Sequence, residues 1–333
     1  MEISLELLEV TQEPLIGRHT PGAENIRWGC EGGLVLEESG YVHVFTTECH
    51  APPKISNTRL AHWRSPDGVT FERVSTLCEA DSPAPDHLRS AMPWTPYPIF
   101  NDEEDRWNLF YVGYGSGSGS DTQIIRSVSE KPGREGLGGP YAPADCPIRG
   151  GADADPWEGT GSAVSFFPFK VRHGWLGFFG CNQFNTRNDV RFIPGLARSP
   201  SLSGPWTRLS HRNPVKMDDR FIENPIVYPV GDDHFITFYD GETVHGIAYA
   251  YSHGGETWSR EKVLWLESPP TPWAWWMRTP LGLIPREDGG HWLYYTAFDY
   301  ADFDTNDPDE PRSRWYHRGF GTVGRIGIDI HLS

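Results

Sequence analysis

The sequence predicts an all-β fold, a five-bladed β-propeller with four-stranded antiparallel blades around a central funnel. Three observations favour this fold. Short apolar segments separated by turns recur along the whole chain of 333 residues. The composition, with 13% aromatic residues, 36 Gly and 29 Pro, is typical of many strands and turns rather than of long helices. Equivalent strand starts at Glu31, Trp94, Glu158, Glu223 and Arg278 are 63, 64, 65 and 55 residues apart.

The regular spacing favours a radial arrangement of the repeats. One four-stranded sheet cannot bury both of its faces alone, whereas sheets stacked around an axis cover one another and leave only short edges. We therefore expect residues 1–333 to form a single propeller domain, in which the segment Leu5–Val10 completes the last blade and closes the ring. The alternative, a β-sandwich with long loops, agrees less well with the spacing.

The first two repeats show the pattern of strand, turn, aromatic strand and further strands. The first repeat turns at Ser39-Gly40 and again at Pro66-Asp67-Gly68, residue types that favour tight turns. Its expected strands are Trp28–Leu36, Tyr41–Thr46, Arg59–Ser65 and Phe71–Val74. In the second repeat the expected strands are Pro93–Phe100, Trp107–Val112 and Gln123–Ser127, with a Gly/Ser tract before the third.

The last three repeats follow the same order. The third is expected at Trp157–Phe166, Trp175–Phe179, Gly195–Ser199 and Ser203–Leu209. The fourth is expected at Phe221–Tyr228, His234–Tyr239, Ile247–Ser252 and Thr257–Ser259. For the fifth, the expected strands are Met277–Ile284, Trp292–Thr296 and Gly324–Ile330.

Three of the strand starts carry a carboxylate: Glu31, Glu158 and Glu223. In a propeller the first strand of each blade lines the axis, so these side chains are expected to face one funnel from three directions. Cleavage of a glycosidic bond needs one protonated carboxyl group as acid and one ionised carboxylate as base or nucleophile. Repulsion between neighbouring carboxylates raises the pKa of one of them and so produces the acid. Any one of these residues could instead cap a turn, but three in register favour a shared pocket.

Charge and motifs exclude several classes of protein. A net charge of −16 argues against nucleic acid as a partner. The five cysteines form no CxxC or Cys/His metal spacing, and we expect no cofactor, although an axial structural ion such as calcium stays open. We find no phosphate-binding loop, dinucleotide fingerprint, zinc-protease motif or nucleophile elbow. No apolar run is long enough to span a membrane, so no membrane partner is expected. The N-terminus has no signal-peptide pattern, which favours a cytoplasmic protein with reduced cysteines; a processed secreted form stays open.

The expected rim of the funnel is aromatic and basic. Sugar rings pack their C–H faces on aromatic rings, and an arginine can bind a hydroxyl, carboxylate or phosphate group. The candidate substrate-binding residues are Trp28, Trp94, Tyr97, Arg89, Trp276 and Arg278. Packing between blades is the alternative for the aromatic residues, and we favour it for Trp107, Trp175, Trp206, Trp258 and Trp292. For Arg278 the alternative is an ion pair with Glu223 or Glu31.

The layout resembles the five-bladed propeller glycoside hydrolases, most closely family 43, with families 32, 68, 117 and 130 as relatives in fold. The resemblance covers nearly the whole chain. Glu31, in Cys30-Glu31-Gly32-Gly33, stands where family 43 carries its acidic base, and Glu223, in Glu223-Asn224-Pro225, matches the acid. Glu158 is the counterpart of a third acid that tunes the pKa of the proton donor. The chain departs from the family with Glu for Asp at the base and the third acid, and with Tyr97 in place of an acid in Trp94-Thr95-Pro96-Tyr97.

The resemblance implies a glycoside hydrolase that acts on an oligosaccharide. Glu223 would be the acid, Glu31 the base or nucleophile and Glu158 the tuning residue. By resemblance alone, we expect inversion and a furanoside or pentoside of a plant or microbial glycan as substrate. Two alternatives stay open, a glycoside phosphorylase on the same fold and a non-catalytic carbohydrate-binding propeller. The oligomeric state is not indicated.

Overall fold

The computed structural model describes residues 2–24, 26, 29–50, 57–79, 88, 90, 92–114, 122–159, 161–186, 189–218, 221–241, 246–265, 273–274, 276–299 and 320–333. The side chains of 161–162, 182–191, 265 and 276 are not described. Of the expected rim residues, Trp28 and Arg89 lie outside the described residues, as does the side chain of Trp276.

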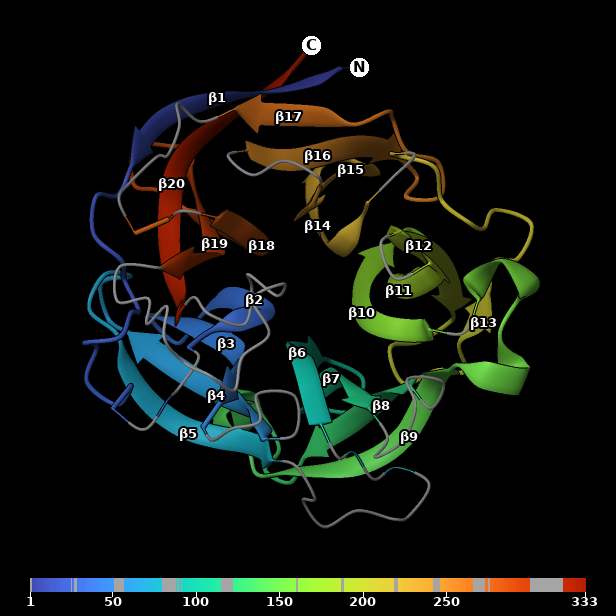
Figure 1. The fold of residues 1–333 in the computed structure, drawn as a ribbon, viewed down its shortest axis with the longest axis horizontal. Coiled ribbons are helices and arrows are strands. Elements are labelled where there is room, and N and C mark those ends of the chain that lie inside the picture. Colours follow the sequence, from blue (N-terminus) through green and yellow to red (C-terminus); the bar gives the residue numbers. More distant parts are fainter. Residues whose placement is uncertain are drawn as a thin grey trace.

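Five four-stranded antiparallel sheets surround a common axis, which confirms the predicted five-bladed propeller (Figure 1). Blade 1 consists of β2 (Glu31–Glu38), β3 (Tyr41–Cys49), β4 (Thr58–Ser65) and β5 (Glu72–Glu79). Blade 2 consists of β6 (Met92–Asn101), β7 (Arg106–Tyr114), β8 (Thr122–Ser129) and β9 (Tyr141–Arg149). Blade 3 consists of β10 (Gly161–Val171), β11 (Gly174–Thr186), β12 (Asp189–Ser199) and β13 (Thr207–Arg208).

The last two blades include the closure of the ring. Blade 4 consists of β14 (Glu223–Gly231), β15 (His234–Asp240), β16 (Gly246–His253) and β17 (Lys262–Trp265). Blade 5 consists of β18 (Trp276–Pro285), β19 (His291–Asp299), β20 (Phe320–Leu332) and β1 (Ile3–Val10). The N-terminal strand pairs with the C-terminal one from Ile3 opposite Leu332 to Val10 opposite Ile326, so it completes the last blade as predicted.

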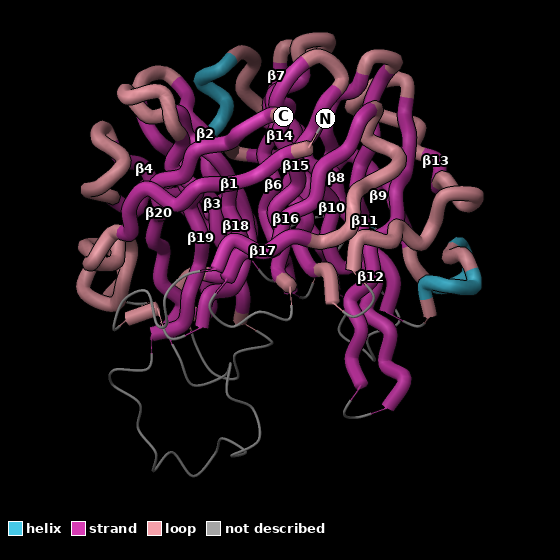
Figure 2. Tube along the Cα trace, turned by 90° about the horizontal axis from the view of Figure 1, so that it is seen from above, coloured by secondary structure: helices cyan, strands magenta, loops and turns pink. Residues whose placement is uncertain are grey.

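The inner strands β2, β6, β10, β14 and β18 lie nearest the axis (Figure 1). Seen from the side, the strands run across the thickness of the molecule, so each inner strand begins near one face and ends near the other (Figure 2). Short 3-10 turns, η3 (Arg134–Gly138), η4 (Gly151–Asp153) and η5 (Pro156–Glu158), connect blades and strands. No described helix is long and apolar enough to cross a membrane.

Aromatic side chains fill the spaces within and between blades. Phe110 of blade 2 lies 5.3 Å from Phe166 of blade 3, and Phe169 lies 5.5 Å from Phe235 of blade 4, measured between ring centroids. Such pairs add attraction beyond the burial of their apolar area. Trp107 and Trp258 are buried, and Trp206 packs edge-on against Phe166. These contacts agree with the packing role expected for these tryptophans.

Four inner strands bend at the same point. Each has a residue with positive φ next to a shift in pairing register, the mark of a β-bulge that redirects the strand. The four residues are Gly32 (φ 57°), Thr95 (52°), Ala163 (63°) and Asn224 (53°). The residues immediately before them are therefore structurally equivalent: Glu31, Trp94, Ser162 and Glu223.

Candidate active site

Three carboxylates surround one arginine where the inner strands begin. Nη2 of Arg278, on β18, lies 3.0 Å from Oε2 of Glu223 and 3.5 Å from Oε1 of Glu31. The same nitrogen lies 3.7 Å from Oδ2 of Asp240. The cluster thus joins the starts of β2, β14 and β18 with the end of β15. Arg278 therefore forms the ion pair that was the alternative to a substrate-binding role, and it does so with both Glu223 and Glu31.

The backbone explains why these side chains converge. Glu223 and Asp240 are directly opposite each other in the antiparallel pairing of β14 and β15, which places two acids side by side. The bulge at Asn224 needs positive φ, a conformation that Asn adopts more readily than most residues. On β2, a Cβ on Gly33 would lie 1.8 Å from the carbonyl oxygen of Phe45, so only glycine fits behind Glu31.

A line of hydrogen bonds supports the cluster from the seam between blades 4 and 5. Asn224 Nδ2 donates to Thr279 Oγ1 over 3.3 Å, and Thr279 Oγ1 donates to Asp240 Oδ2 over 3.3 Å. The amide of Thr279 donates to Thr296 Oγ1 over 3.1 Å. Because all of these groups are buried, each bond also avoids an unpaired polar atom. The seam therefore holds Asp240 and the start of β18 in place.

The four charged side chains are largely withdrawn from solvent. Their exposed fractions are 11% for Glu31, 20% for Glu223, 4% for Asp240 and 14% for Arg278. Burial raises the pKa of Glu223 to about 7; Arg278 opposes this, and the charges of Asp240 and Glu31 add to it. Burial likewise raises the pKa of Asp240 to about 6, against the effect of Arg278. Burial disfavours the charge of Arg278, but its three carboxylate neighbours outweigh this and raise its pKa.

Blade 2 contributes aromatic side chains rather than an acid. Burial raises the pKa of the Tyr114 phenol, and the negative charges of Glu223 and Glu31 add to this effect. Tyr114 therefore keeps its proton and can donate a hydrogen bond. Trp94, in the position equivalent to Glu31 and Glu223, packs edge-on against Tyr114 with 6.5 Å between ring centroids. Trp94 therefore lies beside the last residue of β7.

The arrangement places a proton donor and a proton acceptor in one cluster. One guanidinium cannot balance three carboxylates, so the group with the highest pKa holds a proton near neutral pH. That group is Glu223. Within the described residues, no group of three or more His, Cys, Asp and Glu side chains could hold a metal ion.

The structure does not bring Glu158 into this cluster, which corrects its expected place in the funnel. Glu158 lies in η5, where its side chain is fully buried against Arg208, with Oε1 2.6 Å from Nε and Oε2 3.1 Å from Nη2. It also accepts a hydrogen bond from the amide of Asp155 over 3.0 Å and so completes a capping box. The bulge of blade 3 is at Ala163, so Ser162, four residues later, occupies the equivalent position. Glu158 therefore has the alternative role considered from the sequence, that of an acid that caps a turn.

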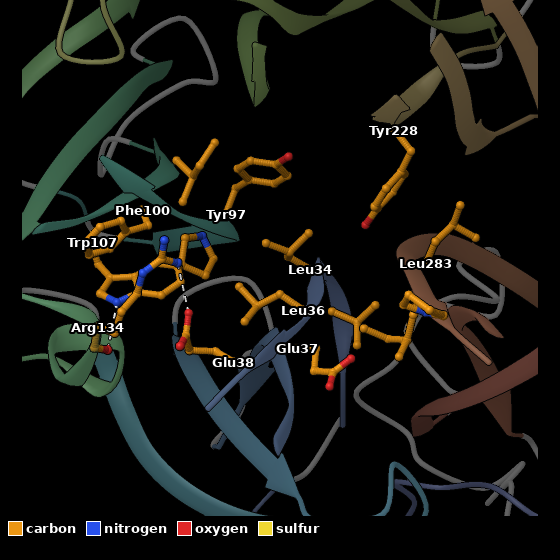
Figure 3. Close-up of a pocket in the computed structure, with 15 residues that line it drawn as sticks. Leu34, Leu36, Glu37, Glu38, Tyr97, Phe100, Trp107, Arg134, Tyr228 and Leu283 are labelled. Carbon is orange, nitrogen blue, oxygen red and sulfur yellow. Dashed lines mark hydrogen bonds and ion pairs between the residues drawn. The ribbon is translucent and has the colours of Figure 1, made fainter. Parts of the chain in front are cut away.

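Tyr97 also differs from its expected place on the funnel rim. It follows the bulge of β6, is buried, and packs edge-on against Phe167 with 5.4 Å between ring centroids. It lines a cavity of about 420 Å³ formed by the later parts of the inner strands, where Tyr228, Leu34 and Leu283 also lie (Figure 3). Because the acids stand at the starts of the same strands, this cavity lies toward the other face of the propeller.

Comparisons with solved structures agree with this architecture. A family 117 glycoside hydrolase, Zg3597 from Zobellia galactanivorans, is 14% identical with a TM-score of 0.67, over 96% of this chain and 90% of its own. The fold is that of the five-bladed propeller glycoside hydrolases.

Two further structures belong to family 43 of the glycoside hydrolases. A GH43_1 enzyme from Xanthomonas citri, complexed with xylose, is 15% identical with a TM-score of 0.60, over 95% and 90% of the two chains. CoXyl43, a β-xylosidase/α-arabinofuranosidase from a compost metagenome in complex with xylotriose, is 14% identical with a TM-score of 0.57, over 97% and 95%. No model of a protein family and no curated protein matches the sequence. At this identity the likeness concerns the propeller glycoside hydrolase fold alone.

Two residues beside the acids were missed by sequence reasoning. Asp240 ends the apolar strand His234–Asp240, and Tyr114 ends Arg106–Tyr114, so both are last residues of second strands. In this propeller such positions face the starts of inner strands. A sequence signal for Asp240 does exist. It is an acid directly after Phe238-Tyr239, at the position that the hairpin of β14 and β15 places opposite Glu223.

Proposed function

We propose that this protein is a glycoside hydrolase in which Glu223 is the general acid and Glu31 the base or nucleophile. The observation that carries the proposal is the group of three carboxylates around Arg278, in which burial raises the pKa of Glu223 to about 7. A carboxyl group with such a pKa is protonated in a useful fraction of molecules near neutral pH, as a proton donor to a leaving group must be.

Each residue of the cluster has a role in the proposed reaction. Glu223 gives its proton to the glycosidic oxygen as the bond to the anomeric carbon breaks. Glu31, which is paired with Arg278, takes a proton from the attacking water or attacks the anomeric carbon itself. Trp94 and Tyr114 offer an aromatic face and a hydroxyl donor for the sugar. The pentose ligands named for the related structures support a pentoside or furanoside as substrate.

The distance between the two acids bears on the stereochemical outcome. Glu31 Oε1 and Glu223 Oε2 lie 3.5 Å and 3.0 Å from the same nitrogen, so these two oxygens are at most about 6.5 Å apart. Retaining enzymes separate the carboxyl groups by about 5–5.5 Å and inverting enzymes by about 6.5–9.5 Å. The upper limit includes the retaining range and reaches only the lower end of the inverting range, so the distance itself does not favour inversion. We propose inversion from the resemblance to family 43 alone. The anomer formed first, followed by NMR, tests this choice.

A phosphorylase on the same fold is disfavoured by the charge of the cluster. Such an enzyme needs a cationic pocket for phosphate beside the acid. Arg278 faces three carboxylates, so its charge is more than balanced before any anion arrives. Addition of phosphate is therefore expected to leave the rate of glycoside cleavage unchanged.

The test is hydrolysis of an aryl-glycoside panel that includes pentosides and furanosides. We expect Glu223→Gln and Glu31→Gln each to lower kcat/KM about 10²–10⁴-fold. Glu37→Gln, a matched change at an exposed position of the same strand as Glu31, should leave the rate unchanged. Full activity in both active-site variants would refute the assignment.

The leaving group separates the two roles. A good leaving group departs without a proton, so Glu223→Gln should lose much less activity on a dinitrophenyl glycoside than on a glycoside of a simple alcohol. Glu31→Gln should lose activity on both, because the attack on the anomeric carbon is impaired in each case. Equal losses by Glu223→Gln on the two substrates would contradict its role as the acid.

A further inference from the structure

Asp240 is the most buried member of the cluster, and the proposed reaction gives it no direct part. Only 4% of its side chain is exposed, and Thr279 Oγ1 donates a hydrogen bond to its Oδ2 over 3.3 Å. The same oxygen lies 3.7 Å from Nη2 of Arg278. Asp240 is thus nearly closed to solvent and is anchored to the seam between blades 4 and 5.

Blade 3 offers no acid at the start of its inner strand, because Ser162 takes the position equivalent to Glu31 and Glu223. The third carboxylate of this site comes instead from the second strand of blade 4. Since Glu223 and Asp240 are direct neighbours across β14 and β15, any charge on one acts on the other at short range.

We propose that Asp240 is a positioning residue, which holds Arg278 between the two reacting acids and keeps the proton on Glu223 through its own negative charge. This inference rests on the proposed glycoside hydrolase function. It replaces Glu158, which the fold keeps in a turn, as the residue that governs the charge of the proton donor.

The hydrogen-bond capacity of Arg278 makes the roles specific. Nη2 carries two hydrogens and has three carboxylate oxygens within 3.7 Å. A protonated Glu223 carries no charge for the guanidinium to balance. The two hydrogens of Nη2 can then both be donated, one to Glu31 and one to Asp240. Asp240 therefore holds Arg278 in its position between Glu31 and Glu223 while Glu223 is the acid.

The sign of the effect follows from the charged and titratable groups that face Glu223 within the described part of the chain. These are Arg278 on β18, Asp240 on β15, Glu31 on β2 and the Tyr114 phenol on β7. Arg278 favours the ionised form of Glu223, whereas Asp240 and Glu31 oppose it. Removal of the Asp240 charge must then lower the pKa of Glu223, so the acid loses its proton at a lower pH.

The pH profile of Asp240→Asn tests the proposal. We expect the alkaline limb of kcat to move to lower pH by about one unit, with a larger loss in kcat than change in KM. Asp240→Glu, which keeps the charge, should restore the limb. Asp233→Asn, at the turn between β14 and β15, is the matched control and should leave the profile unchanged. An unchanged alkaline limb in Asp240→Asn would overturn the proposal.

A second variant and a second measurement keep the test independent of stability and of substrate. Thr279→Val removes the donor that favours ionised Asp240, so it should move the limb in the same direction by less. The Glu223 carboxyl can also be titrated directly by NMR in protein carrying ¹³C at Glu Cδ, with Glu223→Gln to assign its signal. A lower pKa in Asp240→Asn supports the pairing even if no glycoside is cleaved, whereas an unchanged pKa refutes it. Loss of the glycosidase proposal alone would appear as an inactive wild type with the expected titration.

Discussion

Glu158 and Glu223 are both carboxylates withdrawn from solvent and paired with an arginine, but they differ in the balance of charge. Glu158 has Arg208 to itself and accepts a further hydrogen bond from a backbone amide. Glu223 shares Arg278 with Glu31 and Asp240. Glu48 extends the series in the other direction, because it receives hydrogen bonds from both Arg59 and Arg73 and from Trp63 Nε1.

Charge balance distinguishes the carboxylates around Arg278 from Glu158 and Glu48. At Glu158 and Glu48 the arginines equal or outnumber the carboxylate, so no second carboxylate within the described ion pairs repels it. Where carboxylates outnumber arginine, burial and mutual repulsion leave one of them protonated near neutral pH. Each of the three sites contains a buried acid. Of these three, only the cluster around Arg278 has more carboxylates than arginines.

The largest expected difference between the two sites is in stability. Glu158→Gln should lower the free energy of unfolding by about 3–5 kcal/mol, because it leaves Arg208 without its counterion in a buried place. Glu223→Gln should change it by less than about 1 kcal/mol, or raise it, because Arg278 keeps two carboxylate partners. Urea unfolding of the two variants measures both values. Equal losses would break the distinction between the sites.

The stability of the protein should depend on pH through Glu223 and Asp240. In the folded protein the pKa of Glu223 is raised to about 7 and that of Asp240 to about 6, above the values near 4 of the unfolded chain. Between about pH 4 and pH 7 the folded state therefore binds more protons than the unfolded state, so the free energy of unfolding falls as the pH rises. Each group contributes at most about 1.4 kcal/mol per pH unit.

Glu223→Gln should flatten this decline, because it removes one of the two groups that titrate in this window. Urea unfolding of the wild type and this variant at several pH values across the window measures the two slopes. The raised pKa values would be contradicted if Glu223→Gln left the slope of the free energy of unfolding against pH unchanged or made the decline steeper.

The smallest expected effects come from the loss of single hydrogen bonds at the two acid sites. Thr279→Val removes the donor to Asp240, and Asp155→Ala removes the cap of the turn that contains Glu158. Each should cost about 1 kcal/mol in thermal or urea unfolding. Only Thr279→Val should change the pH profile of activity. A shifted profile in Asp155→Ala would connect the two sites, which the structure keeps in different surroundings.

Much of the candidate site could be predicted from the sequence because the repeats mark equivalent positions. Glu31, Glu223 and Arg278 were found at the starts of successive aromatic hairpins, and hairpins are local structures that turn residues and alternating patterns indicate. The spacing could not assign blade 3 correctly. The repeat that ends at Glu223 is 65 residues long if it begins at Glu158 and 61 residues long if it begins at Ser162. Both lengths fit the other repeats, so the spacing predicts Glu158 at the position that Ser162 occupies.

The remaining errors have the same origin in strand geometry. Tyr97 is three residues after Trp94, and the bulge between them moves it out of the funnel rim and toward the cavity at the other face. Asp240 was missed because its importance depends on the strand opposite it and on an arginine of the next blade. Register and bulge position are set by packing and pairing across strands, which a single sequence does not display.

The sequence by itself determined the five-bladed fold, the closure of its ring by the N-terminal strand, and the identity of the two facing acids. Those features depend on periodic and local signals that each repeat carries. Only the tertiary structure decided that Arg278 binds three carboxylates, that the third is Asp240, and that Glu158 belongs to a turn. The reason is that the charge state of a buried acid depends on the count of neighbours around it, and those neighbours come from blades far apart in the chain.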